Sequence, residues 1–303
     1  MTAVGVLCAR VRVEEKQIIA AIDQRGQVAV PVPPAGTPLP PCPASSDVTM
    51  LGEFLDATTG ETMGQSVSLV IDRASNRAVA SATLQLLKVQ GVETLDAGLA
   101  ASGDRVQVAT ALAAAGIARP VSLVGFSEAS AVTAVARLGY PATLLGLIPG
   151  SSSTTLLDAD TADAVIEHRV VLGSDQDAVV LLQAGAPLPE QRSIVHVVGR
   201  HAVAVDGATV SMEHVTMVEY AARVLGASLV AVELAHLPTG TVVWDVLPVG
   251  EFRSARLLGE TTIGEAIADL VQQRTPAMEH ADVTARQPIT IEGGDRHGIQ
   301  LSA

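Results

Sequence analysis

Apolar stretches alternate with helical patterns over roughly the first hundred residues of the chain. Residues 3–9 and 66–72 are continuous apolar runs typical of buried strands, whereas residues 13–26 place isoleucines at helical spacing before a glycine. A second helical pattern, over residues 73–91, precedes a short strand pattern at 92–95. This alternation predicts a parallel sheet that is covered by helices on both faces.

Helical spacing also predicts which side chains of three segments, residues 73–91, 103–116 and 158–173, face the core. Only 2% of the residues are aromatic, so these faces must consist of aliphatic side chains. The predicted buried positions are Val79, Ala82 and Leu86 in the first segment, Val106, Ala109 and Ala113 in the second, and Ala162, Val165, Ile166 and Val170 in the third.

Strand patterns dominate the second half of the chain. Residues 177–185, 193–199 and 201–207 form three strand patterns close together, a run that is typical of an antiparallel sheet. Residues 227–236 and 240–250 are two longer strand patterns joined by a short turn. The two halves therefore predict different sheets within one α/β protein.

Composition and charge limit the class of partner. The formal net charge is −13 and no basic run occurs, so we expect no binding to nucleic acid or to anionic membranes. Lysine is present only as Lys16 and Lys88, and Cys8 and Cys42 provide no disulfide framework. No apolar run is long enough to cross a bilayer, and charges interrupt the amino terminus early, so we expect a cytoplasmic protein.

A hairpin pattern without any charged side chain spans Gly139 to Leu157. Its small-residue loop contains Ser151 and Ser152, whose backbone amides and hydroxyls could cradle a small anion. The same composition is typical of an ordinary solvated turn. The hairpin thus has the outline of a phosphate loop but lacks the cation that a phosphate requires.

Six segments together resemble the ATP-grasp ligases, in particular the LysX-type and RimK-type branch, over roughly residues 3 to 272. One of them, ARVRVEEK, is similar to the opening signature of LysX-type proteins, and another, VWDVLPVGEFRS, falls on the family's metal-binding strand. The segments are residues 9–16, 71–87, 103–120, 137–145, 161–173 and 243–254. The resemblance implies an ATP-grasp-like α/β fold with an N-terminal Rossmann-like parallel sheet. It also implies ATP and Mg²⁺ as cofactors for joining a carboxylate to an amine.

The same resemblance divides the chain into four predicted parts. These are an N-terminal pre-ATP-grasp domain at residues 1–95, a central ATP-grasp subdomain at 96–175, a C-terminal ATP-grasp subdomain at 176–274 and a peripheral tail at 275–303.

Four further residues fall at the family's site positions. Arg105 follows a Gly-Asp pair where the family has a phosphate-binding lysine, and Gln183 begins the adenine hinge. Glu233 and Asp245 fall at two metal-ligand positions, although each could instead be a strand-edge carboxylate paired with arginine or water. With the two loop serines, these are the candidate residues for ATP and Mg²⁺, and we identify no catalytic residue.

Several positions depart from the family pattern. Leu145 replaces a second phosphate-binding lysine, Ile194 a catalytic arginine and Leu247 a metal-binding asparagine, while Ala184 follows Gln183 where the hinge has a glutamate. A loop of roughly twenty residues that grips the phosphates is also missing. Because preorganised charge contributes much of the stabilisation in phosphoryl transfer, these changes argue against a working site.

The sequence leaves three functional hypotheses. The first is a homologue that has lost ATP-dependent ligation and serves as a binding or partner subunit in amino-acid metabolism, as a homo-oligomer or in a hetero-oligomer with an active ligase. The second is an active ATP- and Mg²⁺-dependent carboxylate–amine ligase of lysine or arginine biosynthesis or of protein modification. The third is a small-molecule sensor that uses the interdomain cleft.

Overall fold

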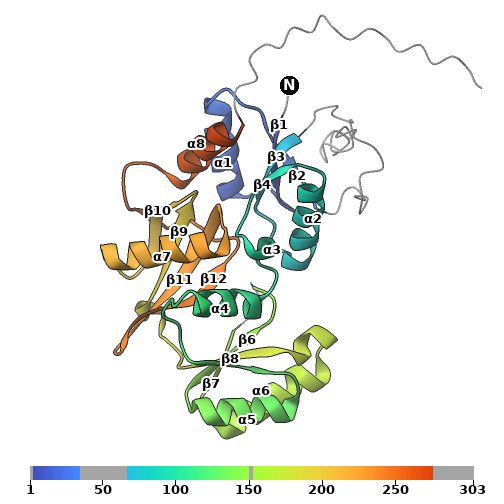
Figure 1. Ribbon diagram of the computed structural model, residues 1–303, viewed down its shortest axis with the longest axis vertical. Coiled ribbons are helices and arrows are strands. Elements are labelled where there is room, and N and C mark those ends of the chain that lie inside the picture. The colour runs from blue at the N-terminus through green and yellow to red at the C-terminus, as the bar shows by residue number, and fades with distance from the viewer. Residues whose placement is uncertain (1–2, 35–66, 150–152, 276–303) are drawn as a thin grey trace, which may run out of the picture.

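The structure is a computed structural model that describes residues 3–34, 67–149 and 153–275. Within these ranges the chain forms one parallel and two antiparallel sheets with helices around them (Figure 1). The α/β class predicted from the sequence is therefore confirmed.

The amino-terminal part of the chain folds into alternating strands and helices. They are β1 (Ala3–Leu7), α1 (Val13–Gln24), β2 (Ala29–Val32), β3 (Val67–Asp72), α2 (Arg77–Val89) and β4 (Glu93–Leu95). The strands pair in the parallel order β2-β1-β3-β4. One face of this sheet packs against α1 and the other against α2, as the alternating pattern predicts.

The central part forms a four-stranded antiparallel sheet in the order β5-β8-β6-β7, with α5 and α6 packed on it. Its elements, with the two helices that precede them, are α3 (Leu99–Ser102), α4 (Arg105–Ala114), β5 (Ser122–Gly125), α5 (Glu128–Leu138), β6 (Ala142–Gly146), β7 (Thr154–Leu156), α6 (Ala159–Leu172) and β8 (Val180–Ala184). Short 3₁₀ helices at Asp175–Ala178 and Pro189–Gln191 flank β8. The predicted hairpin is confirmed as β6 and β7.

The carboxy-terminal part forms the third sheet. Its elements are β9 (Arg192–Val198), β10 (His201–Gly207), α7 (Met212–Leu225), β11 (Leu229–Leu237), β12 (Gly240–Leu247), β13 (Arg256–Leu257) and α8 (Ile263–Arg274). The strands pair antiparallel in the order β12-β11-β9-β10-β13, and α4 and α7 cover one face. The sequence predicted β8 beside β9 and β10, and this is wrong, because β8 pairs with β5 and β6.

Two of the three predicted helix faces are also wrong. In α2 the buried side chains are Ala80, Leu84 and Leu87, while Val79 is exposed, and in α4 they are Val108 and Leu112. Helix α4 is rich in small apolar residues on all sides, so spacing alone does not select one face. Helix α2 is clearly amphipathic, and the prediction chose the stripe next to its buried one. The predicted face of α6 is confirmed, with its alanine and isoleucine fully buried.

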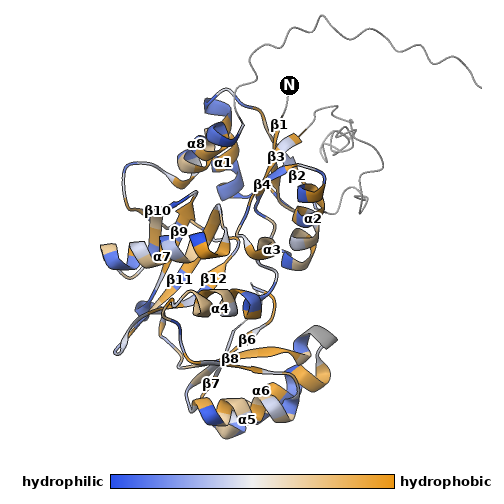
Figure 2. Cartoon of the chain, viewed as in Figure 1, coloured by the Kyte–Doolittle hydropathy of each residue, from blue (hydrophilic) through white to orange (hydrophobic). Residues whose placement is uncertain are grey.

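One core joins the two ends of the chain. Helix α8 follows the C-terminal sheet in sequence but packs on α1, and Arg25 of α1 forms an ion pair of 2.7 Å with Asp269 of α8. The shared core contains Ile18 and Leu69 from the N-terminal part and Leu229 from the C-terminal sheet. Figure 2 shows the apolar residues on the strands and the polar ones on the outer faces of the helices.

Two further predictions concern the cysteines and membrane-spanning segments. Cys8 is buried and unpaired, and burial raises the pKa of its thiol to about 11, so it is a small core side chain and not a reactive thiol. Cys42 lies outside the described residues. None of the described helices has the length and apolarity to span a membrane.

Candidate functional site

Arg105 joins the central part of the chain to the C-terminal sheet. It is the first residue of α4, where Asp104 caps the helix, and its side chain is buried. Its Nη2 lies 2.8 Å from Oδ2 of Asp245, while Nη1 donates to the carbonyl oxygens of Gly146 and Ile148 at 2.9 and 3.1 Å. The guanidinium therefore binds the very carboxylate that the resemblance assigns to metal.

The second candidate metal ligand is also paired with an arginine. Glu233 on β11 lies directly opposite Asp245 on β12 and Ile194 on β9, so all three side chains share one face of the sheet. Nη1 of Arg192 lies 3.0 Å from Oε1 of Glu233, and its guanidinium carbon is 5.9 Å from the ring centroid of Trp244. Strand-edge pairing with arginine, one of the two alternatives, is what this geometry displays.

Burial dominates the electrostatics of this region. It raises the pKa of Glu233 above the ordinary value, against the opposing effect of Arg192, and the nearby Asp245 carboxylate adds to the rise. Burial also lowers the pKa of Arg119, which Asp245 partly offsets. Nε of Arg119 is buried without a hydrogen-bond partner. The site thus contains more guanidinium than its two carboxylates can neutralise.

Gln183 connects the central sheet to the same strand. It is fully buried on β8, and its Nε2 donates to the backbone oxygen of Trp244 at 3.2 Å. Its Oε1 has no hydrogen-bond partner. We call Arg105, Gln183, Arg192, Glu233 and Asp245 the intersheet site.

The remaining candidate positions contribute no charge. Leu145 is buried on β6, and Ile194 and Leu247 are half-buried on the C-terminal sheet. Ser151 and Ser152 lie outside the described residues, so the structure does not place them.

Mg²⁺ does not fit the intersheet site as it is built. The ion needs several oxygen ligands, and both available carboxylates already accept hydrogen bonds from arginine. Among the residues that the structure describes, no group of three or more His, Cys, Asp or Glu side chains could hold a metal ion. A guanidinium stands beside each carboxylate that a metal would need.

A cavity of about 870 Å³ lies elsewhere, between the end of α7, the β9–β10 turn and α8. Its charged lining is mixed, with Arg200 and Arg223 facing Glu219 and Glu260. None of the residues of the intersheet site lines it. We therefore regard the contacts around Asp245, and not this cavity, as the location of the family site.

Arg192 and Arg119 are the site residues that sequence reasoning missed. Arg192 was detectable, because it stands two positions before Ile194 on the same strand and alternate strand residues share a face. Arg119 follows α4 in a segment without regular structure, so no pattern indicated where its side chain would lie.

Comparison with known proteins finds solved structures with the same overall fold. No protein-family model matches the sequence. A RimK-domain ATP-grasp protein from Sphaerobacter thermophilus DSM 20745 is 28% identical with a TM-score of 0.70, and the match covers 88% of this chain and 98% of that chain. The ATP-grasp ligase PsnB, in complex with a minimal precursor, Mg and ADP, is 14% identical with a TM-score of 0.62, covering 90% and 98%.

A third similar structure is the macrocyclase MdnC from Microcystis aeruginosa MRC, bound with the precursor peptide MdnA. It is 13% identical with a TM-score of 0.63, and the match covers 90% of this chain and all of that chain. The fold is therefore that of the ATP-grasp ligases. Of these three structures, the RimK-domain protein has the highest identity to this chain.

Proposed function

We propose that this chain is an ATP-grasp protein that has lost ATP-dependent carboxylate–amine ligation and acts as a binding or partner subunit in amino-acid metabolism. The observation that carries the proposal is the occupation of both metal-position carboxylates by arginines, Arg105 on Asp245 and Arg192 on Glu233. Under this proposal, two arginine guanidinium groups lie where a ligase would bind magnesium.

The free energies of ion pairing and of ligand binding favour the arginines over a metal ion at these two carboxylates. Removing one partner of a buried ion pair typically costs about 3–5 kcal/mol, and the Arg105–Asp245 pair is buried on both sides. A ligand present at about a thousand times its dissociation constant contributes only about 4 kcal/mol. Mg²⁺ would have to displace this pair and also the more exposed Arg192–Glu233 pair.

Peptides bound in structures of other proteins with this fold support the binding role. The structures of PsnB and MdnC contain precursor peptides, so this fold can carry a peptide as well as a nucleotide. A chain that lost the nucleotide function could retain the surface for a protein or peptide. We propose a cytoplasmic homo-oligomer or a hetero-oligomer with an active ligase as the working assembly.

Thermal unfolding with nucleotide tests the proposal. We expect no rise in the unfolding midpoint of this chain at 1 mM Mg-ATP, while PsnB with Mg-ADP serves as the matched positive control. A dissociation constant near 10 µM would stabilise the chain by about 2.7 kcal/mol at that concentration, which is easily measured. A concentration-dependent rise would contradict the proposal.

Activity and assembly provide a second measurement. Amino-acid-dependent release of ADP would establish the active ligase instead of the partner subunit. Purification of the chain from its own cells should yield a complex of defined stoichiometry. A monomer without partner would contradict the partner role but not the loss of ligation.

A further inference from the structure

Helix α3 is a left-handed turn made of residues that all carry side chains. Leu99, Ala100, Ala101 and Ser102 have φ angles of 31°, 54°, 61° and 44°. Residues other than glycine rarely adopt this conformation even singly, because the Cβ atom approaches the following carbonyl oxygen. Four in succession store strain in the segment that joins β4 to α4.

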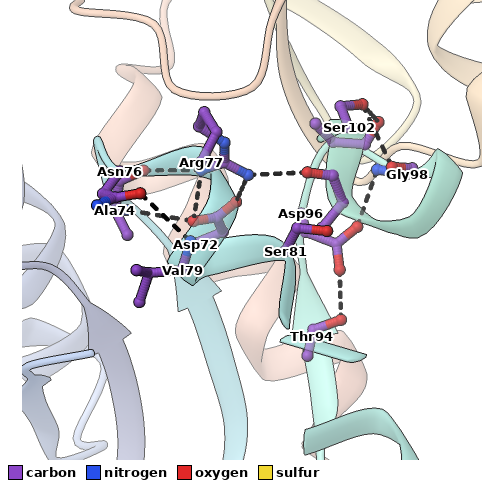
Figure 3. A network of polar contacts seen from close by, with 12 residues as sticks. Asp72, Ala74, Asn76, Arg77, Val79, Ser81, Thr94, Asp96, Gly98 and Ser102 are labelled. Carbon is purple, nitrogen blue, oxygen red and sulfur yellow. Dashed lines mark hydrogen bonds and ion pairs between the residues drawn. The ribbon is translucent and has the colours of Figure 1, made fainter. Parts of the chain in front are cut away.

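A buried arginine holds one side of this turn. Nη2 of Arg77 donates to the carbonyl oxygen of Ala101 at 2.9 Å and to Oδ2 of Asp72 at 2.7 Å. Nη1 donates to the carbonyl oxygen of Ala74 at 2.7 Å, and both charged side chains are almost fully buried. Figure 3 shows Arg77 between Asp72 and the segment that carries Ser102. The turn is thereby tied to β3 and α2 of the N-terminal sheet.

Further hydrogen bonds tie the turn to the C-terminal sheet. The backbone N–H of Gly98 donates to Oδ1 of Asp96 at 2.8 Å (Figure 3), and the carbonyl oxygen of Asp96 accepts from the N–H groups of Ser228 and Leu229 at 2.8 and 3.0 Å. The N–H of Ser102 closes the turn on the carbonyl oxygen of Gly98. Two sheets therefore meet at these few residues.

The turn determines where α4 begins and hence where Arg105 lies. Only Gly103 and Asp104 separate it from Arg105, whose N–H donates to the carbonyl oxygen of Leu147 at 2.8 Å and whose side chain binds Asp245. A relaxed, right-handed path through residues 99–102 would change the direction of the chain entering α4. It would thereby withdraw the guanidinium from the intersheet site.

We propose that residues 98–102 form a strained hinge, held by the Asp72–Arg77 pair, that controls whether Arg105 lies on Asp245 and thus whether the intersheet site is closed. Strain of this kind persists only where the surroundings over-determine it, and it is concentrated at sites that move. The hinge does not depend on the loss of ligation, because it is inferred from the backbone of residues 99–102 and the hydrogen bonds of Arg77.

Glycine substitution tests the strain directly. Ala100 is exposed, so Ala100→Gly removes little packing and should raise the thermal unfolding midpoint by about 2–4 °C. The matched control is Ala113→Gly, at an exposed position of the right-handed α4, which should lower the midpoint by a similar amount. A decrease for Ala100→Gly equal to that of the control would overturn the proposal.

Amide hydrogen exchange tests the coupling to the site. Arg77→Met leaves Asp72 buried without its partner and lowers the stability of the whole chain, so the amides of β9 and β11 report that general loss. Exchange of the Arg105 amide should accelerate at least about tenfold more than theirs. Arg25→Met, which breaks the ion pair with Asp269, should leave the Arg105 amide unchanged. Uniform acceleration over the whole chain, or none at Arg105, would overturn the coupling.

Should Arg77→Met fail to fold, Ala100→Gly decides the same question. Relief of the strain favours the closed form, so exchange of the Arg105 amide should slow relative to the unmodified chain. An unchanged or faster rate in this folded variant would overturn the hinge. Nucleotide binding plays no part in either measurement, so the outcome is independent of the proposed function.

Discussion

Arg105 and Asp245 illustrate how a buried charge pair can specify a structure without adding much stability. Their side chains are about one-twentieth and one-tenth exposed, so each loses most of its hydration on folding. The attraction between them largely offsets that loss, and little net stability remains. Breaking the pair is a different matter, because it leaves one charge buried without a partner.

We expect Asp245→Ala to lower the free energy of unfolding by about 3–5 kcal/mol, because the Arg105 guanidinium then stays buried without its carboxylate. Replacing both residues, as in Arg105→Met with Asp245→Leu, should recover most of that loss. Urea unfolding followed by circular dichroism measures both. As a control, Arg274→Ala should cost less than about 1 kcal/mol, since Arg274 and its partner Glu93 are 50% and 36% exposed. Equal effects of Asp245→Ala and Arg274→Ala would contradict this view.

The raised pKa of Glu233 makes stability depend on pH. The ordinary value is 4.5, and burial keeps the folded chain protonated at pH values where the unfolded chain has released its proton. The resulting contribution is fully present below pH 4.5 and is lost as the pH rises through the folded pKa. Glu233→Gln cannot ionise, so we expect it to gain stability relative to the unmodified chain as the pH rises from 4.5.

Unfolding free energies measured at several pH values for both chains give this difference. A constant difference would mean that Arg192 balances burial at this position, and a loss of relative stability by Glu233→Gln as the pH rises would mean that Arg192 outweighs burial.

The turn between α7 and β11 depends on close contact between two elements. Gly98 precedes α3, and a Cβ atom on it would lie 1.9 Å from the carbonyl oxygen of Leu225 at the end of α7. Gly226 shares the positive φ, +66° against +69°, but its ψ is 26° against −165° for Gly98, and a Cβ atom there would meet nothing within 4 Å. Gly98 therefore combines steric overlap with a backbone conformation that is essentially restricted to glycine, whereas Gly226 is an ordinary left-handed residue.

We expect Gly226→Ala to cost about 1–2 kcal/mol, the price of a left-handed alanine, and Gly98→Ala to cost more than about 4 kcal/mol because both the overlap and a conformation restricted to glycine oppose a side chain there. Chemical denaturation of the two variants provides the comparison. Similar costs would indicate that α7 can shift away from residue 98.

The N-terminal and C-terminal parts of the chain share one core, although the sequence suggests separate domains, whereas the central sheet has a core of its own. Ile267 of α8 is fully buried against α1, and residues of the C-terminal sheet belong to the same cluster. Trp244, the single tryptophan of the chain, is buried on β12 of that sheet. Its fluorescence therefore reports on a strand remote from α8.

We expect Ile267→Ala to lower the free energy of unfolding by about 2–5 kcal/mol and to shift the Trp244 transition together with the circular dichroism transition. The control Leu172→Ala, at a side chain that is 73% exposed, should change stability by less than about 0.5 kcal/mol. A Trp244 transition that stays in place while the rest of the signal shifts would show independent unfolding of the parts.

Element types were predictable, because each follows from local periodicity. Alternating patterns led to the parallel sheet, and the apolar strands around the uncharged loop led to the β6–β7 hairpin. The partner of β8 and the face of α4 were not predictable, because both depend on which element packs there and α4, rich in small apolar residues, can bury more than one face. The face of α2 was predictable, since Ala80, Leu84 and Leu87 recur at helical spacing.

The candidate site divides in the same way. Reading the chain alone identified the carboxylates Glu233 and Asp245, the cation Arg105, and the aliphatic residues at positions that would need charge. Only the folded arrangement paired Arg105 with a carboxylate 140 positions away and Arg192 with one 41 positions away. Arg192 and Glu233 meet because β9 and β11 are neighbours in one sheet, and Arg105 reaches Asp245 because α4 packs against that sheet. No local pattern records which side chains will then face each other.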